Sequence, residues 1–304
     1  MVLFTFRGFP TINRLLFFFG QCFTCRRAMV NKLWHRVSRK WSRLKPEPPH
    51  ARLFSECRYQ EEVRPWYLYY RWLMFLAWTA IIVCSIFELG SYQPHGNNHL
   101  WGIYLTNWDL VFGLSQSFFG ALIVTRRWKL QKCCNFDATS LELSPLLRIY
   151  WFLYVVTCTL ALSVTIIYWS VVYNPNIHSV DFLNILLHVF NSILMIIDMC
   201  MVKIPIFLFS VWWCLIVALL YVLFSVIYYA AGGVDKLGNH FIYAILDWKR
   251  PMRTLIVCLA VMTFLLIVHG VFCLLAKLAD RGCTRRKTID ITKTISTKSV
   301  EVIV

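Results

Sequence analysis

Five polar residues follow one face of an apolar stretch between residues 181 and 198 that contains no Lys or Arg. They are Asp181, Asn184, His188, Asn191 and Asp198. Their spacings of 3, 4, 3 and 7 residues place them on one side of an α-helix, which turns about 100° per residue. A histidine in such a stripe can accept a proton from a hydroxyl group, and the hydroxyl then becomes a nucleophile that attacks a carbonyl carbon.

A second apolar stretch, residues 103–125, carries a matching polar face. Its members, spaced 3, 4, 3 and 4 residues apart, are Thr106, Asp109, Gly113, Gln116 and Gly120. Thr106 offers the hydroxyl group, and Asp109 or Asn184, each one turn from a reacting residue, could orient the imidazole of His188. As an alternative, the two polar faces bond to each other and hold the helices together, with the glycines allowing close approach. A third reading is a transporter, with Asp109, Gln116 and Asp198 along a polar path.

The elements that must position these residues are six apolar segments, each long enough to cross about 30 Å of hydrocarbon. The segments are 67–89, 103–125, 146–171, 180–201, 204–228 and 254–276. The chain has 304 residues, of which 59% are hydrophobic, whereas soluble domains average about 45–50%. The expected fold class is all-α: a polytopic membrane protein with six transmembrane helices in one bundle. Pro205 beside Lys203 separates the fourth segment from the fifth.

The basic residues predict how the chain is oriented. If the N-terminus is cytoplasmic, 27 of the 31 Lys and Arg fall on the cytoplasmic side, so both termini are expected there. Residues 1–66 would form a basic cytoplasmic region, 67–276 the transmembrane domain and 277–304 a basic cytoplasmic tail. The net charge of +16 favours anionic lipids at the cytoplasmic face as partners, and no motif indicates nucleic acid. Residues 33–44 form either an amphipathic surface helix or part of a disordered tail.

Other residues carry separate predictions. Cys133 and Cys134 follow a basic run at a cytoplasmic membrane edge, where S-palmitoylation and free thiols are equal alternatives. The C-terminal Val304 ends an alternating apolar run of the type that PDZ domains bind. The motif formed by Cys22 and Cys25 lacks a second pair at zinc spacing, so neither a metal site nor a cofactor is predicted.

Two polar residues within the apolar segments are predicted to have structural roles. Asp198 is expected to pair with a neighbour such as Lys203, and His269 is expected to be a hydrogen-bonded structural residue. Translation could begin at Met1 or at Met29, and the sequence leaves both alternatives open.

Four motifs carry a resemblance to a known family. They are "PWYLYYRW" (65–72), "YLTNWDL" (104–110), "HVFNSILMIIDM" (188–199) and "GGVDKLGNHFIYAILDW" (232–248). In these motifs and their order, residues 56–280 resemble the insect rolling stone family of multi-pass membrane proteins. This resemblance implies a role in myoblast fusion during muscle development, and hence the plasma membrane rather than the endoplasmic reticulum.

A fainter resemblance reaches the androgen-induced and androgen-dependent membrane hydrolases, which cleave fatty acid esters of hydroxy fatty acids. "YLT" (104–106) is similar to their threonine motif, and His188 lies in the helix where their histidine would be. This resemblance implies Thr106 as nucleophile, His188 as general base and a lipid ester as substrate. With both termini in the cytoplasm, Thr106 and His188 are both expected in the outer half of the bilayer, from which the ester would enter.

Overall fold

The structure, a computed structural model, describes residues 47–94, 96, 98–133, 136–175 and 179–301, with side chains through Gly282. Within these residues the chain is helical and forms no β-strand beyond isolated bridges at Cys57. The described part contains six helices that are long and apolar enough to cross a membrane. The predicted all-α membrane bundle with six spans is therefore confirmed.

The first three spans are α2 (Pro65–Ile86), α3 (Leu105–Leu130) and α4 (Pro145–Ile167), and a π-helical turn (Tyr168–Val172) continues the last of them. The fourth span joins α5 (Phe182–Ile185), a π-helical turn (Leu186–Phe190) and α6 (Asn191–Met201). The last two are α7 (Val211–Ala230), which follows a 3-10 turn (Leu208–Ser210), and α8 (Pro251–Glu301). Helix α8 thus continues beyond residue 276 into the segment that was predicted to form a cytoplasmic tail.

Local sequence explains where the spans begin. Helices α2 and α4 both have proline in the first turn, where the missing N–H costs no hydrogen bond. Ser144 caps α4, since its hydroxyl accepts the N–H of Leu147 at 3.4 Å. Asp181 caps the fourth span and accepts the N–H of Asn184 at 2.8 Å. Such caps satisfy donors that would otherwise be left unpaired at a helix start.

The fourth and fifth spans are separated at the predicted place. Helix α6 ends at Met201, and Val202 has extended backbone angles of φ −95° and ψ 156°. Residues 203–207, which include Pro205, are not helical. The fifth helical segment consequently begins at Leu208 rather than at residue 204.

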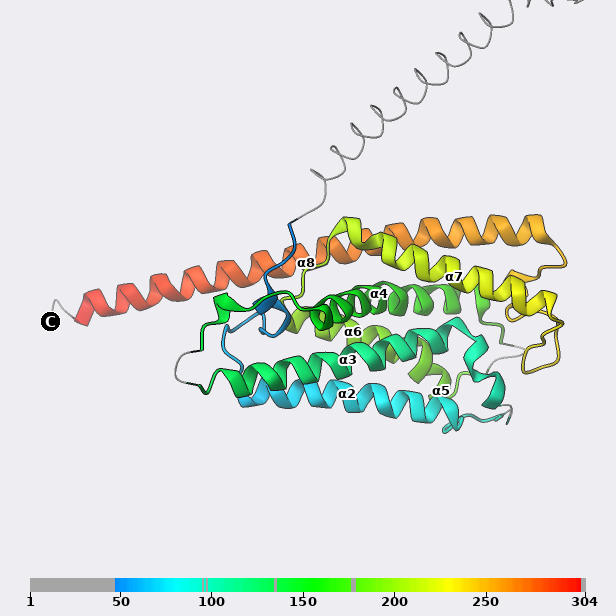
Figure 1. Ribbon diagram of the computed structural model, residues 1–304, viewed down its shortest axis with the longest axis horizontal. Helices are drawn as coiled ribbons and strands as arrows, with labels where there is room; N and C mark the ends of the chain where they lie inside the picture. Colours follow the sequence, from blue (N-terminus) through cyan, green and yellow to red (C-terminus); the bar gives the residue numbers. More distant parts are fainter. Residues whose placement is uncertain (1–46, 95, 97, 134–135, 176–178, 302–304) are drawn as a thin grey trace, which may run out of the picture. The chain divides into compact units, whose positions relative to one another are not determined.

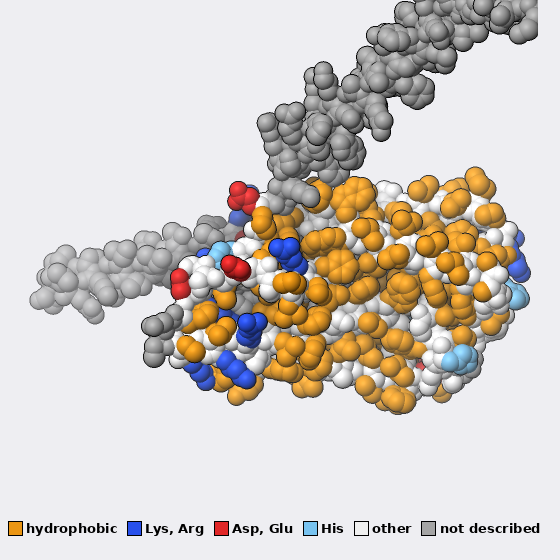
Figure 2. All heavy atoms as spheres, in the orientation of Figure 1, with side chains coloured by type: hydrophobic (Ala, Val, Ile, Leu, Met, Phe, Trp, Pro, Cys, Tyr) orange, Lys and Arg blue, Asp and Glu red, His pale blue; other side chains and the backbone are white. Residues whose placement is uncertain are grey.

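Helix α4 lies centrally in the bundle (Figure 1), where it contacts α3, α6, α7 and α8. Helix α2 packs mainly against α3, and α7 packs against α8. One end of the bundle holds residues 49–64, 131–133, 136–144 and 202–207; we call it the 49–64 end. The other holds residues 231–250 and the described residues of the connections that follow α2 and α4, which are 87–94, 96, 98–104, 173–175 and 179–181; we call it the 231–250 end. Figure 2 shows a hydrophobic surface between the two ends, with many of the Lys and Arg at the 49–64 end.

Residues 49–64 pack into their end of the bundle. The Phe54 ring is 2% exposed and meets the rings of Tyr150 and Trp151 edge-on. Arg58 is also buried, and its guanidinium donates to the carbonyl of Met199 at 2.9 Å and pairs with Asp280. Residues 49–64 therefore contact the start of α4, the end of α6 and helix α8. The amphipathic helix considered for residues 33–44 lies outside the described residues.

Candidate functional site

The two polar faces meet inside the bundle. The side-chain amide of Asn191 on α6 donates to Oδ2 of Asp109 on α3 at 3.1 Å, and both residues are fully buried. Next to them, the Ser192 hydroxyl lies 2.6 Å from the hydroxyl of Thr165 on α4. These contacts support the reading in which polar stripes hold neighbouring helices together.

The two glycines of α3 make room for large side chains from other helices. A Cβ atom at Gly113 would overlap the Trp78 ring on α2. A Cβ atom at Gly120 would overlap the Arg71 guanidinium and crowd the Tyr150 hydroxyl. The glycines thus admit an aromatic ring and a charged group into a tightly packed interior.

The charged group beside Gly120 belongs to a buried ion pair. Nη1 of Arg71 lies 2.6 Å from Oδ1 of Asp198, and the two side chains are 0% and 1% exposed. The Tyr70 hydroxyl donates to the same carboxylate oxygen at 2.8 Å. Arg71 also donates to the Tyr150 hydroxyl at 2.8 Å. A charge at this depth requires such partners, because hydrocarbon offers none.

Asp198 therefore pairs with another side chain, as predicted, but its partner is Arg71 and not Lys203, the example that the sequence suggested. Helix α6 ends before Lys203, whose ammonium group instead lies 2.8 Å from the carboxylate of Glu56. Sequence proximity suggested Lys203, whereas the actual partner, Arg71, comes from the first span.

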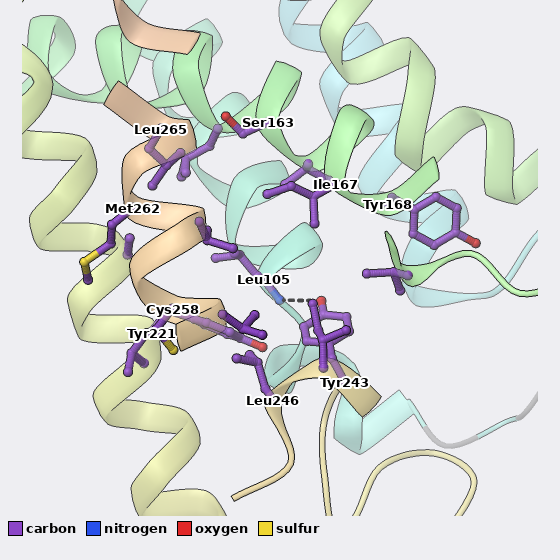
Figure 3. Close-up of a pocket in the computed structure, with 18 of the residues that line it drawn as sticks. Leu105, Ser163, Ile167, Tyr168, Tyr221, Tyr243, Leu246, Cys258, Met262 and Leu265 are labelled. Atoms are coloured by element: carbon purple, nitrogen blue, oxygen red, sulfur yellow. Dashed lines mark hydrogen bonds between the residues drawn. The ribbon is translucent and has the colours of Figure 1, made fainter. Parts of the chain in front are cut away.

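Thr106 lies in the first turn of α3 and lines a cavity of about 100 Å³. The other walls come mainly from α4, α7 and α8 and from residues 243–246. Figure 3 shows Tyr243 next to the start of α3. The Leu105 N–H donates to the Tyr243 hydroxyl oxygen at 3.1 Å, and the Thr106 hydroxyl bonds to the same oxygen. The predicted nucleophile is thus buried at the edge of an apolar cavity, at the 231–250 end.

His188 lies in the π-helical turn of the fourth span and stacks on Tyr168, with ring centres 3.4 Å apart and planes at 3°. Tyr168 lines the cavity, but among the described residues that form its walls His188 does not appear. Asn184, considered as an orienting group, donates its amide to the Tyr168 hydroxyl at 2.6 Å. Asp109 is likewise engaged by Asn191. Thr106 and Tyr168 thus both line the cavity, and His188 stacks on Tyr168, while the pairing of Thr106 with His188 stays a prediction.

Asp181, at the start of the polar stripe, works as a helix cap and loop anchor. Its carboxylate also accepts the N–H of Tyr92 at 3.0 Å and the hydroxyl of Ser179 at 3.1 Å. Burial by itself would raise the pKa of Asp181, but these hydrogen bonds outweigh burial and hold the pKa below its ordinary value. Asp181 is therefore ionised and structural.

One hydroxyl–imidazole contact in the bundle joins two residues that the sequence did not predict to be neighbours. Nδ1 of His269 on α8 lies 3.0 Å from the Thr159 hydroxyl on α4, and its Nε2 donates to the Phe207 carbonyl at 2.9 Å. His269 is thus hydrogen-bonded and fully buried, in agreement with its predicted structural role. No spacing in the sequence connects Thr159 with His269, because they lie on different helices and 110 positions apart.

The remaining candidates lie at the 49–64 end or beyond the described residues. Cys133 is exposed just after α3, next to Lys132, whose ammonium group lies 3.4 Å from the centre of the Trp128 ring. Cys134 and Val304 are outside the described residues. Among the described residues, no three His, Cys, Asp or Glu side chains lie together in a way that could hold a metal ion.

Comparisons with known proteins agree with this architecture. Residues 48–289 match the family model described as "Protein rolling stone". Protein rolling stone from Drosophila melanogaster is 29% identical over 239 residues, which cover 72% of this chain and 82% of that protein. No solved structure matches the chain. The family match includes all six spans, and it confirms the resemblance predicted from the four motifs.

Proposed function

Because the chain belongs to the rolling stone family, we propose that it acts in cell–cell fusion, as in myoblasts, or in related membrane remodelling during development. The observation that carries this proposal is the family match across residues 48–289, which contain the six spans found in the described part of the chain. The proposed location is the plasma membrane, where fusion takes place.

The proposed orientation has the 49–64 end in the cytoplasm. Its support is the distribution of Lys and Arg, which gather at that end of the bundle (Figure 2). The 231–250 end would then face outward with short connections only, such as residues 87–104 and 231–250. Contacts with partners would consequently be made within the membrane or on the cytoplasmic side, where anionic lipids meet the basic residues.

A fusion assay tests this function. Cells that normally fuse would be depleted of the protein and mixed as two populations with different cytoplasmic dyes. We expect content mixing to fall while cell adhesion is unchanged, and re-expression of the full chain to restore mixing. Unchanged content mixing in fully depleted cells would contradict the proposal.

A second candidate function is hydrolysis of a lipid ester by Thr106 and His188. Its specific support is the position of Thr106 on an apolar cavity within the spans. In the first step, His188 would take the hydroxyl proton while the threonine oxygen forms a bond to the ester carbonyl carbon. The protonated histidine would then pass its proton to the departing alcohol, and water would release the acyl group by the same steps.

Purified protein, a branched fatty-acid ester and a fluorophosphonate label test this candidate. Thr106→Ala and His188→Ala should each abolish turnover, and Thr106→Ser should retain it because serine keeps the hydroxyl. Thr263→Ala is the matched control, since Thr263 lies exposed on α8 and bonds only its own helix, at the Leu259 carbonyl. Labelling that persists in Thr106→Ala would refute the role of this residue.

A further inference from the structure

We propose that the cavity beside Thr106 binds a single acyl chain of a lipid whose headgroup is uncharged. The cavity has a volume of about 100 Å³ and is bounded by α4, α7 and α8, three helices that can cross the membrane. An engineered cavity of about 150 Å³ binds benzene, so this one has room for a short length of hydrocarbon chain. The cavity is partly open, and the rest of a longer chain would extend from it among the helices.

The walls are suited to hydrocarbon. Two of the hydroxyl groups that border the cavity are engaged elsewhere: Ser163 donates to the Thr159 carbonyl at 2.7 Å, and Tyr168 accepts the Asn184 amide at 2.6 Å. Figure 3 shows the hydroxyl oxygen of Tyr168 pointing away from the other labelled side chains. Binding is favourable when a hydrocarbon chain replaces water or a void next to apolar surface of this kind.

The residues that line the cavity disfavour a charged ligand. Among the described residues that line it, none is Asp, Glu, Lys, Arg or His. A carboxylate or phosphate placed there would be desolvated without a counter-charge, which is strongly unfavourable. The occupant is therefore a neutral lipid, such as a monoacylglycerol or a fatty alcohol, rather than a free fatty acid or a phospholipid headgroup.

One edge of the cavity can hydrogen-bond such a headgroup. The oxygen of Tyr243 accepts bonds from the Leu105 N–H at 3.1 Å and from Thr106, and its hydroxyl is also hydrogen-bonded with the hydroxyl of Tyr221. Burial raises the pKa of Tyr243 above its ordinary value, and the phenol therefore keeps its proton. Tyr221, on the same edge, already donates to the Ile103 carbonyl at 2.9 Å. The linked hydroxyl groups of Tyr243 and Tyr221 are thus the polar groups on this edge that would meet an ester or alcohol oxygen.

This site deepens the second candidate function, because it names the lipid class that would reach Thr106. Binding requires no turnover, however, and the two can fail independently. A Thr106→Ala protein should lose hydrolysis and still bind the lipid. Loss of binding in a protein that still hydrolyses esters would overturn the site alone.

Cys258 provides a direct probe, because it lines the cavity and is 7% exposed. The full chain in detergent would be treated with a small alkylating reagent, and modification of Cys258 would be followed by peptide mass spectrometry. Monoolein should slow this modification in a saturable manner, whereas oleate and lysophosphatidylcholine should not. Cys200, which is exposed on α6, is the internal control and should react at the same rate throughout.

Variants on adjacent positions of α7 complete the experiment. Ala218 lines the cavity, whereas its neighbour Leu219 is 57% exposed. Ala218→Trp should weaken protection by monoolein about tenfold, the effect of losing about two buried methylene groups. Leu219→Trp should leave protection unchanged, and Tyr243→Phe should weaken it about threefold to tenfold through the lost hydrogen bond.

The outcomes are decisive even if Ala218→Trp fails to fold, because the unmodified chain is tested first. Protection of Cys258 by monoolein alone supports the proposal. Equal protection by oleate would overturn the selectivity for neutral lipids. No protection by any lipid, or equal protection of Cys258 and Cys200, would overturn the site.

Discussion

Removing one partner of the buried Arg71–Asp198 pair should destabilise the protein far more than removing both. Asp198→Ala would leave the guanidinium of Arg71 buried without its anion, and the hydroxyl of Tyr70 would lose its acceptor. Loss of one partner of a buried pair costs about 3–5 kcal/mol. Replacing both with apolar residues of similar volume, as in Arg71→Met with Asp198→Leu, is often close to neutral.

The structure justifies the upper part of this range. The two side chains are 0% and 1% exposed, and their contact is 2.6 Å long, so solvent screens neither charge. Thermal unfolding in detergent, followed by size-exclusion chromatography, measures the effect. A loss in the upper part of the range, about 4–5 kcal/mol, should lower the Tm by roughly 8–20 °C. Arg126→Ala, at an exposed position on α3, is the control and should change the Tm little.

The result that would refute this reasoning is additivity. If the double variant were destabilised by the sum of the single effects, the two residues would contribute independently rather than as a pair. Single variants with the Tm of the unaltered protein would show that the charges are not buried together.

Two further predictions concern packing and pH. Gly120→Ala should cost about 1–3 kcal/mol in thermal unfolding, because its Cβ would overlap Arg71; Gly270→Ala, where a Cβ meets nothing within 4 Å, should be neutral or stabilise by about 0.5–1 kcal/mol. A cost at Gly270 equal to that at Gly120 would contradict this explanation. The pKa of Asp181 is lowered in the folded protein, so its stabilising effect is complete above the ordinary value of about 3.9 and is lost as the pH falls through the lower folded value. Asp181→Asn should therefore reduce the acid dependence of the Tm below about pH 4, and an unaltered dependence would show that Asp181 is not the group involved.

Periodicity and composition predicted the spans because both are local properties. A run of about 20 apolar residues can be recognised without knowledge of its neighbours, and the polar stripes on α3 and α6 were expected on one face each. The contact between Asp109 and Asn191 agrees with that expectation. Pro205 marked the break after α6 for the same local reason, since proline cannot continue a helix.

Partners across the bundle could not be predicted, because spacing within a helix does not show which helices are adjacent. Arg71 and Asp198 are 127 positions apart, and Lys203 was the nearer candidate in sequence. His188 stacks on Tyr168 in a π-helical turn, which hydrophobic periodicity does not reveal. Tyr243, in the connection 231–250, accepts the N–H of Leu105 at the start of α3. The motif at residues 232–248 indicated the family, but it did not predict this contact.

The orientation of the bundle underlies both the fusion role and a lipid site in the outer half of the membrane, and one labelling measurement tests it most directly. Intact cells would be treated with a membrane-impermeant maleimide, which reaches only external thiols. The account predicts that a His240→Cys protein, altered at an exposed position of the 231–250 connection, reacts on intact cells. The unaltered chain should react only after permeabilisation, through the exposed Cys133 near the 49–64 end. Labelling of Cys133 on intact cells, with His240→Cys protected, would contradict the account.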